Sequence, residues 1–188
     1  RAVAINLVDN DSVYIHGKKL MVTGKPPFRI IRAFNNARFY KTDLSGKCDS
    51  IHSSQATNLT QLLGNPVLWN METQMTGDVM HLIGNKATQK LDSLKILNNT
   101  FIISKDTIGT GYNQVKGLNL YGKFKEGKIH ETDIIKNTEV IYYLRNDDNE
   151  LIGINKNVSS RINIIFDGDT VDTMTFFTDV DGDIYPEA

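Results

Sequence analysis

The sequence predicts an almost all-β protein built from a repeated, stacked β unit. Apolar and polar residues alternate along much of the 188-residue chain, and this period of two is typical of half-buried strands. Two short signatures each recur four times, and we find no convincing stretch with the apolar spacing of three to four residues that marks an amphipathic helix. We therefore expect strands joined by turns along the whole chain.

The first signature is a polar residue, an apolar residue, a short or basic polar residue and then a small residue. It occurs at Asp43–Gly46, Gln74–Gly77, Gln114–Gly117 and Asn157–Ser160. The second signature is an asparagine followed by a run of β-forming residues. It begins at Asn36, Asn65, Asn99 and Asn137.

The spacing of the two signatures predicts a repeat architecture. Each first signature lies 22, 25 or 23 residues before the next second one, whereas the return spacing grows from 7 to 9, 15 and 20 residues. A constant unit with lengthening connections is typical of repeats that carry insertions on one face. We expect Gly46, Gly77 and Gly117 to lie where the sheet bends sharply, which gives an open, curled sheet or a flattened jellyroll.

Individual strands and turns follow from local composition. Residues 13–16, 118–121 and 161–166 alternate as strands do, and Thr, Ile, Val, Tyr and Phe fill such runs. Pairs containing Gly or Asn adopt a positive φ at little cost and predict tight hairpin turns. These pairs are Gly84–Asn85, Asn98–Asn99, Glu126–Gly127 and Asp167–Gly168, while residues 24–27 and 104–113 are predicted loops.

Composition predicts one domain over residues 1–188, because hydrophobic content of 40% with 23% charged residues is ordinary and shows no break along the chain. No apolar run approaches the roughly 20 residues that span a bilayer, so we do not expect a membrane-spanning protein. The chain begins at Arg1 without a cleavable leader, and we expect it to be a mature segment of a longer product.

Charge is distributed unevenly. Residues 1–47 carry nine Lys and Arg against three Asp and Glu, whereas the remainder carries twelve against nineteen. Nucleic-acid binding needs a basic stripe with stacking aromatics over the whole site, so we expect no nucleic-acid partner. A basic end suits contact with phosphate groups or with the acidic end of a neighbouring molecule. Scattered, solvated charge is the alternative.

No motif indicates catalysis, a metal or a cofactor. Residues Asp179–Asp183 resemble the start of a calcium loop, but glycine falls at the fourth position instead of the sixth and no glutamate follows at the twelfth. The four histidines are isolated, and Cys48 is the only cysteine, which is typical of a buried strand residue. We find no nucleophile elbow, P-loop or dinucleotide turn and expect no enzyme activity.

The repeated units resemble the OstA-like family as it occurs in Bacteroidetes-type bacteria, a family related to the periplasmic bridge protein of lipopolysaccharide transport. The resemblance rests on residues 36–50, 64–69, 74–78 and 113–117 and extends over residues 10–186. It implies a twisted, edge-stacked antiparallel β-jellyroll in a Gram-negative periplasm, possible association with the outer membrane, no cofactor, and a groove that holds lipid acyl chains. It also implies edge-strand pairing with like jellyroll domains, including a head-to-tail homo-oligomer.

The resemblance implies spread-out lipid contacts, so the candidates are apolar residues of the alternating strands, for which we expect an inward orientation. The groove candidates are Ile51, Leu59, Val67, Trp69, Val79, Leu94, Ile96, Phe101, Leu118, Leu120, Ile141 and Tyr143. A basic rim for lipid phosphates would be formed by Lys18, Lys19, Arg29, Arg32 and Arg38. A one-residue change of register would reverse each inward assignment.

The leading hypothesis is a non-enzymatic periplasmic carrier of lipopolysaccharide or a similar amphiphile between the inner and outer membranes. Sequence leaves open whether the interior is an open trough or a filled core. A filled core favours the alternative, a structural or adhesive β-sandwich that binds protein or glycan through residues 106–113 or 146–149. A third hypothesis, a β-helix enzyme that degrades polysaccharides, would require carboxylates converging in one cleft.

Overall fold

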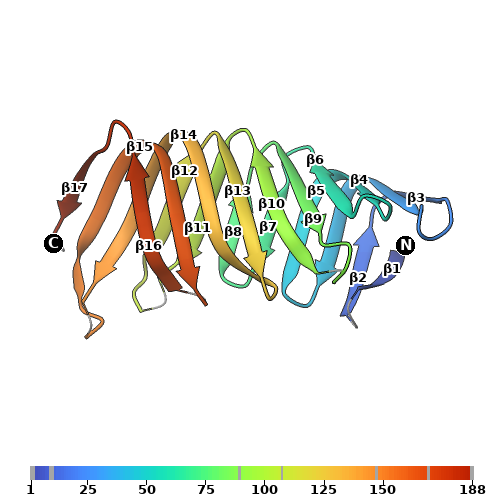
Figure 1. Cartoon of the computed structure of the whole chain (residues 1–188), viewed down its shortest axis with the longest axis horizontal. Helices are drawn as coiled ribbons and strands as arrows, with labels where there is room; N and C mark the ends of the chain where they lie inside the picture. Colours follow the sequence, from blue (N-terminus) through green and yellow to red (C-terminus); the bar gives the residue numbers. More distant parts are fainter. Residues whose placement is uncertain are drawn as a thin grey trace.

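The computed structural model describes residues 3–8, 11–88, 90–106, 108–146, 148–168 and 170–186. Within these ranges the chain forms 17 strands joined by turns, without a helix, and hence without a helix that could cross a membrane. All strand pairings are antiparallel. The predicted all-β fold is confirmed, and its strands stack side by side into an elongated jellyroll with the termini at opposite ends (Figure 1).

The strands form one continuous sheet that folds over into two facing layers, which we call sheet I and sheet II. The long strands β4, β5, β14 and β15 cross from one layer to the other. Sheet I contains, in spatial order, β1 (Val3–Val8), β2 (Asp11–His16), β4 (Ile30–Lys41), β5 (Leu44–Ser54), β7 (Val67–Asn70), β8 (Thr73–Thr76), β11 (Thr100–Lys105), β12 (Tyr112–Gly117), β14 (Lys128–Arg145), β15 (Leu151–Asp167) and β17 (Asp181–Tyr185). Sheet II contains β3 (Lys19–Thr23), β4, β5, β6 (Leu59–Leu63), β9 (Val79–Gly84), β10 (Leu91–Leu97), β13 (Asn119–Lys125), β14, β15 and β16 (Thr170–Phe177).

The two layers join along one long edge, which we call the closed edge and which forms the top of Figure 1. Each crossing from sheet II to sheet I uses two consecutive residues of positive φ. The pairs are Asn35–Asn36, Gly64–Asn65, Asn98–Asn99, Lys136–Asn137 and Thr178–Asp179. Asn tolerates this left-handed conformation better than most residues, which explains why all four asparagines of the second signature lie at corners.

Small residues line the inside of the closed edge, where the layers converge. They form one ladder across the strands: Gly17, Ala37, Cys48, Pro66, Gly77, Thr100, Gly117, Thr138 and Ser159. A Cβ atom at Gly77 would lie 2.3 Å from Ile96 Cγ2, and one at Gly117 would lie 2.4 Å from Ile134 Cγ2. Close packing between the layers therefore restricts the size of the inward side chains along the closed edge.

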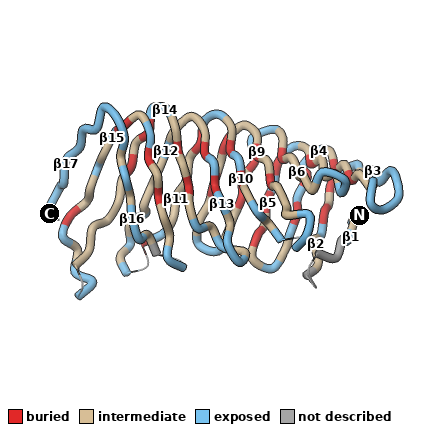
Figure 2. Tube along the Cα trace, in the orientation of Figure 1, coloured by how far each residue is buried: buried red, intermediate tan, exposed pale blue. Residues whose placement is uncertain are grey.

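The core lies between the layers, where alternate residues of each strand point inward. Figure 2 shows buried residues on successive strands along the molecule and exposed residues at the hairpins and ends. Leu94, Ile96, Leu120, Ile134 and Ile162 are fully buried in the centre. At about 25 cal/mol per Å² of apolar surface removed from water, such inward rows are the main stabilising contribution.

Two details of the sequence prediction require correction. Gly46 is not at a corner: the corner of β5 lies at Cys48 and Asp49, and the inward space at Gly46 is filled by the Phe39 ring, 2.4 Å from where a Cβ would lie. Asn98–Asn99 is a corner between the layers instead of a hairpin turn. Gly77 and Gly117 do lie at corners, as expected.

Candidate functional site

The opposite long edge, which we call the seam, is formed by the hairpins of the two layers and lies at the bottom of Figure 1. Near the N-terminal end the layers enclose a cavity of about 380 Å³ beside this seam. Its apolar wall comes from both layers: Val13, Ile15, Phe39 and Leu44 from sheet I, and Ile31, Ile51, Leu82, Leu91 and Phe124 from sheet II.

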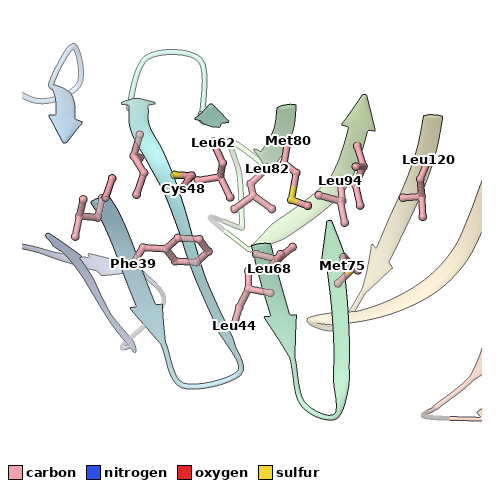
Figure 3. Close-up of a cluster of buried hydrophobic side chains, with 14 of the residues drawn as sticks. Phe39, Leu44, Cys48, Leu62, Leu68, Met75, Met80, Leu82, Leu94 and Leu120 are labelled. Carbon is pink, nitrogen blue, oxygen red and sulfur yellow. The ribbon is translucent and has the colours of Figure 1, made fainter. Parts of the chain in front are cut away.

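Side-chain size explains why the cavity forms here. The inward positions nearest the seam carry short side chains at Ser53, Thr60 and Gly84, all of which line the cavity. Ser53 and Thr60 satisfy each other through a hydrogen bond of 2.8 Å between their hydroxyl oxygens. Deeper inside, Phe39, Leu44 and other apolar side chains fill the space between the layers (Figure 3). The cavity is thus an apolar space with a polar mouth.

Charged residues surround the mouth. Arg29, Lys41 and Lys90 contribute cations, while Asp43 and Glu126 contribute carboxylates. Lys41 Nζ lies 2.8 Å from Asp43 Oδ1, and no described carboxylate forms an ion pair with Arg29. Cations outnumber carboxylates at this mouth, which suits an anionic group at its entrance.

Two hairpins approach each other across the seam beside the cavity. Asn70 Nδ2 donates a hydrogen bond of 2.8 Å to the carbonyl oxygen of Asp43 and holds the β4–β5 hairpin in place. The Glu126–Gly127 turn between β13 and β14 faces this hairpin, since a Cβ built on Gly127 would lie 3.8 Å from Asp43 Oδ2. Residues of both hairpins line the cavity, on the side that faces the centre of the molecule.

Farther along the seam an ion pair ties together the two long connections of sheet I. Arg145 Nη2 lies 2.5 Å from Asp106 Oδ2, and Arg145 Nη1 donates to the carbonyl of Asn149. The hydrogen bond from Arg145 lowers the pKa of the Asp106 carboxyl, assisted by the backbone N–H of Ile108, while burial opposes this shift. We call this pair the seam clamp.

Four of the twelve groove candidates point into the interior. Ile51 lines the cavity, and Leu94, Ile96 and Leu120 lie fully buried in the packed centre. The structure places seven others on the outer faces, because they alternate with inward residues; Trp69, for example, follows the fully buried Leu68. These seven are Leu59, Val67, Trp69, Val79, Phe101, Ile141 and Tyr143, and Leu118 lies at a corner, where its N–H bonds to Ile135 and Lys136.

The five candidates for a basic rim do not lie together. Arg29 is at the mouth of the cavity. Lys18 is at a corner of the closed edge, where its N–H donates to the carbonyl of Asn35, and Lys19 begins the edge strand β3. Arg32 points outward from sheet II and Arg38 outward from sheet I, since each alternates with buried neighbours. A common rim is therefore incorrect: crossing between layers separates residues that are close in sequence.

Several cavity residues were not predicted, although the sequence carries a signal for them. Positions three residues before and after each corner asparagine face the interior: Ala33 and Phe39 flank Asn36 in this way, as do Leu62 and Leu68 around Asn65. The position of each corner asparagine therefore indicates which alternate residues of the adjoining strands face the interior. Applied to β4, it assigns Ile31 and Phe39 to the cavity wall and Arg32 and Arg38 to the surface.

Other chemistry at the described positions is limited. No three described His, Cys, Asp or Glu side chains come close enough to hold a metal ion. Burial raises the pKa of the Cys48 thiol to about 11, and its Sγ contacts the carbonyl of Ser50 at 3.2 Å. The cavity offers apolar surface with a charged mouth, which suits an amphiphilic ligand.

These features define an open-seamed antiparallel β-jellyroll with an internal apolar cavity. No family model matches the sequence, and no curated protein matches it either. Among solved structures, the chain is similar to LptH from Pseudomonas aeruginosa, described as the LptA-homologous periplasmic component of the conserved lipopolysaccharide transport device. The two share 14% identity with a TM-score of 0.57, over 76% of this chain and 95% of LptH. The protein therefore has an LptA-like fold.

Proposed function

We propose that this protein binds an amphiphile of the lipopolysaccharide type in the periplasm, with acyl chains in the seam cavity and the anionic head group at its mouth. The observation that carries the proposal is the cavity of about 380 Å³, walled by apolar residues from both layers of an LptA-like jellyroll. Transfer of each methylene from water into such a wall contributes about 0.8 kcal/mol. Arg29, with which no described carboxylate forms an ion pair, would meet a phosphate of the head group.

The binding site in this proposal is the local cavity near the N-terminal end, instead of an extended groove lined by all twelve predicted residues. Ile51 remains a lipid contact, whereas Leu94, Ile96 and Leu120 fill a packed centre and the outward candidates line no interior space. Phe39, Leu44, Leu82 and Leu91 become contacts. Arg29 remains the phosphate candidate of the predicted five, because it is the one at the cavity mouth.

Site-specific photocrosslinking tests this assignment. A photoreactive residue at Leu91, in the cavity wall, is expected to crosslink to rough-type lipopolysaccharide, whereas one at Ile141, on the outer face of sheet I, is not. The variant Ser53→Phe should fill part of the cavity and reduce lipid retained in native mass spectrometry at least severalfold. Thr175→Phe, on an exposed position of β16, is the matched control. Crosslinking at Ile141 with none at Leu91 would contradict an internal site.

The ends of the jellyroll suit joining to like domains, as the second part of this proposal. Strands β1 and β3 form the N-terminal margin, and β17 and β16 form the C-terminal margin. Unpaired edge strands are templates for pairing with another chain. The N-terminal margin lies near Lys18 and Lys19, whereas the C-terminal strand β17 carries Asp181 and Asp183, so opposite charges favour head-to-tail order.

The strand directions define how such a joint would form. Sheet I has β1 and β17 in the same direction, while sheet II has β3 and β16 in opposite directions, because every successive pair is antiparallel. A head-to-tail neighbour would join antiparallel in sheet II, the more stable arrangement per residue. Val22→Asp in the exposed strand β3 adds a carboxylate to the basic margin and should weaken self-association measured by light scattering, whereas Tyr121→Asp, on the outer face of β13 away from both margins, should leave it unchanged.

A further inference from the structure

The outer face of sheet I carries an aromatic–basic patch at its N-terminal end. Outward residues of neighbouring strands form two rows in register. One row runs from Tyr14 through Tyr40 and Ser45 to Trp69, and the row beside it contains His16, Arg38 and Lys47. Together these residues line a shallow hollow on the surface. The patch faces away from the internal cavity, because its side chains alternate with the buried residues Ile15, Phe39 and Leu68.

Two cations of the basic row, Arg38 and Lys47, have no carboxylate opposite them among the described residues. Arg38 lies directly opposite Lys47 on the neighbouring strand, and cross-strand pairs of like charge are destabilising. No described carboxylate forms an ion pair with Arg38 or Lys47. The contrast along the same row is clear, since Lys116 lies opposite Glu139 and forms an ion pair with it. Charge complementarity therefore points to an anionic ligand at Arg38 and Lys47.

The aromatic row offers stacking surfaces beside this charge. Residues Tyr14 and Tyr40 are 42% and 57% exposed, with ring centroids 6.5 Å apart. Trp69 is held in position because its Nε1 donates to Gln74 Oε1 at 2.9 Å, and Lys47 Nζ lies 5.4 Å from the centroid of its ring. Ser45, with its short side chain, lies between Tyr40 and Trp69 and leaves room for a ring above the sheet.

We propose that the aromatic–basic patch binds an anionic oligosaccharide, with a sugar phosphate at Arg38 and Lys47 and sugar rings stacked on Tyr40 and Trp69. Aromatic faces carry partial negative charge and attract the positively polarised C–H groups of a sugar ring. A guanidinium recognises phosphate through paired hydrogen bonds. This site is separate from the lipid cavity and does not depend on it, since the ligand needs no acyl chain.

Tryptophan fluorescence gives a direct readout, because Trp69 is the only tryptophan of the chain. The probes are a lipid-free, phosphorylated core oligosaccharide from rough-type lipopolysaccharide, the same oligosaccharide after dephosphorylation, and inorganic phosphate. We expect the phosphorylated oligosaccharide to change Trp69 emission in a saturable way. Binding should weaken about tenfold in Arg38→Ala or Lys47→Ala and fall with added salt.

Matched controls keep the outcome interpretable. Lys95→Ala removes an exposed cation from the outer face of sheet II and should leave the titration unchanged. Tyr40→Ala should weaken binding of the oligosaccharide while leaving any response to inorganic phosphate the same. Equal binding of the dephosphorylated oligosaccharide would overturn the role of the cations, and equal affinity for inorganic phosphate would overturn the role of the rings. Tighter binding of a single-stranded oligonucleotide, or no response to any probe, would overturn the proposal.

Discussion

The closed edge and the seam are made by the same strands, yet they differ in almost every physical property. At the closed edge, corner asparagines and small residues bring the layers together, and Ala37, Thr100 and Thr138 are almost completely buried. At the seam the strands end in hairpins, the inward side chains include Ser53 and Thr60, and a cavity opens.

The difference shows that an internal cavity can arise from side-chain size alone, within an unchanged pattern of alternation. In sheet I, small inward residues lie at the closed-edge ends of the strands from β2 to β15, and large inward residues fill the middle. In sheet II, the short residues Ser53, Thr60 and Gly84 lie toward the seam beside the cavity. In a closely packed region, enlarging or shortening a side chain lowers the free energy of unfolding, whereas a side chain that faces a cavity can be enlarged with little loss of stability. Substitutions at the two edges should therefore behave differently.

The largest effect is expected at the seam clamp, where Asp106 is as deeply buried as residues of the closed edge. Arg145→Ala leaves the Asp106 carboxylate, whose side chain is only 8% exposed, without its guanidinium partner. We expect a loss of about 3 kcal/mol in the free energy of unfolding, measured by urea denaturation at pH 7. A loss within error of zero would show that the two connections are held by other contacts.

The same clamp predicts a pH dependence. Because Arg145 lowers the pKa of Asp106 in the folded state, this contribution is fully present above the unfolded value near 4 and is lost as pH falls through the lower folded value. The stability difference between the native protein and Arg145→Ala should therefore shrink below about pH 4. Asp106→Asn serves as the control, because its stability should lack this acid-dependent component.

A glycine pair compares the two edges directly. A Cβ at Gly77, in the closed edge, would lie 2.3 Å from Ile96 Cγ2, whereas a Cβ at Gly84, in the cavity wall, would have no atom nearer than 3.5 Å. We expect Gly77→Ala to cost about 2 kcal/mol through overpacking. Gly84→Ala should be neutral or stabilise by up to about 1 kcal/mol, because alanine restricts the unfolded chain. Equal melting temperatures of the two variants would remove the proposed difference in packing.

A smaller effect is expected from the corner conformation itself. Asn137 has a φ of 51°, a conformation that costs other L-residues about 1–2 kcal/mol and costs glycine little. Asn137→Ala should therefore lower the free energy of unfolding by about 1 kcal/mol, and Asn137→Gly should be close to the native protein. If both variants lost the same stability, the asparagine side chain and not the backbone conformation would determine the corner.

These corners also show what the sequence could and could not predict. Strand alternation and the asparagine signature predicted the all-β repeat, since both are local properties that follow from backbone sterics. The side of the sheet on which each apolar residue lies was predicted for Ile51 and Leu94 but not for Val67 or Trp69. A one-residue error reverses both faces, and large apolar residues such as Trp69 occur on the outer face as well.

The cavity was harder to predict because it depends on contacts between distant strands. Ile31 and Phe124 are more than ninety positions apart, yet both line it. The predicted basic rim failed for a related reason: Arg32 and Arg38 lie on either side of the corner at Asn35–Asn36 and point outward from different layers. Charge counted along the chain identified the basic end but not its distribution between faces.

The smallest expected effect concerns the reactivity of a thiol at each edge. Cys48 belongs to the buried ladder of the closed edge, and burial raises the pKa of its thiol to about 11. A neutral thiol is a poor nucleophile, so we expect Cys48 to resist iodoacetamide at pH 8 until urea unfolds the protein. In the double variant Cys48→Ala with Ser54→Cys, the new thiol at the cavity wall should react at least tenfold faster in the folded state.

The dependence of the free energy of unfolding on pH, measured at alkaline pH, provides an independent check on the same thiol. In the unfolded chain the Cys48 thiol ionises near pH 9, whereas in the folded protein it ionises near 11. Between these values the folded state binds more protons than the unfolded state, so the stabilising contribution of the neutral thiol is present below pH 9 and declines as pH rises toward 11. Cys48→Ala should lose less stability than the native protein over this interval. Rapid alkylation of native Cys48 at pH 8 would instead mean that the closed edge opens locally, which would remove the basis for treating the two edges as different.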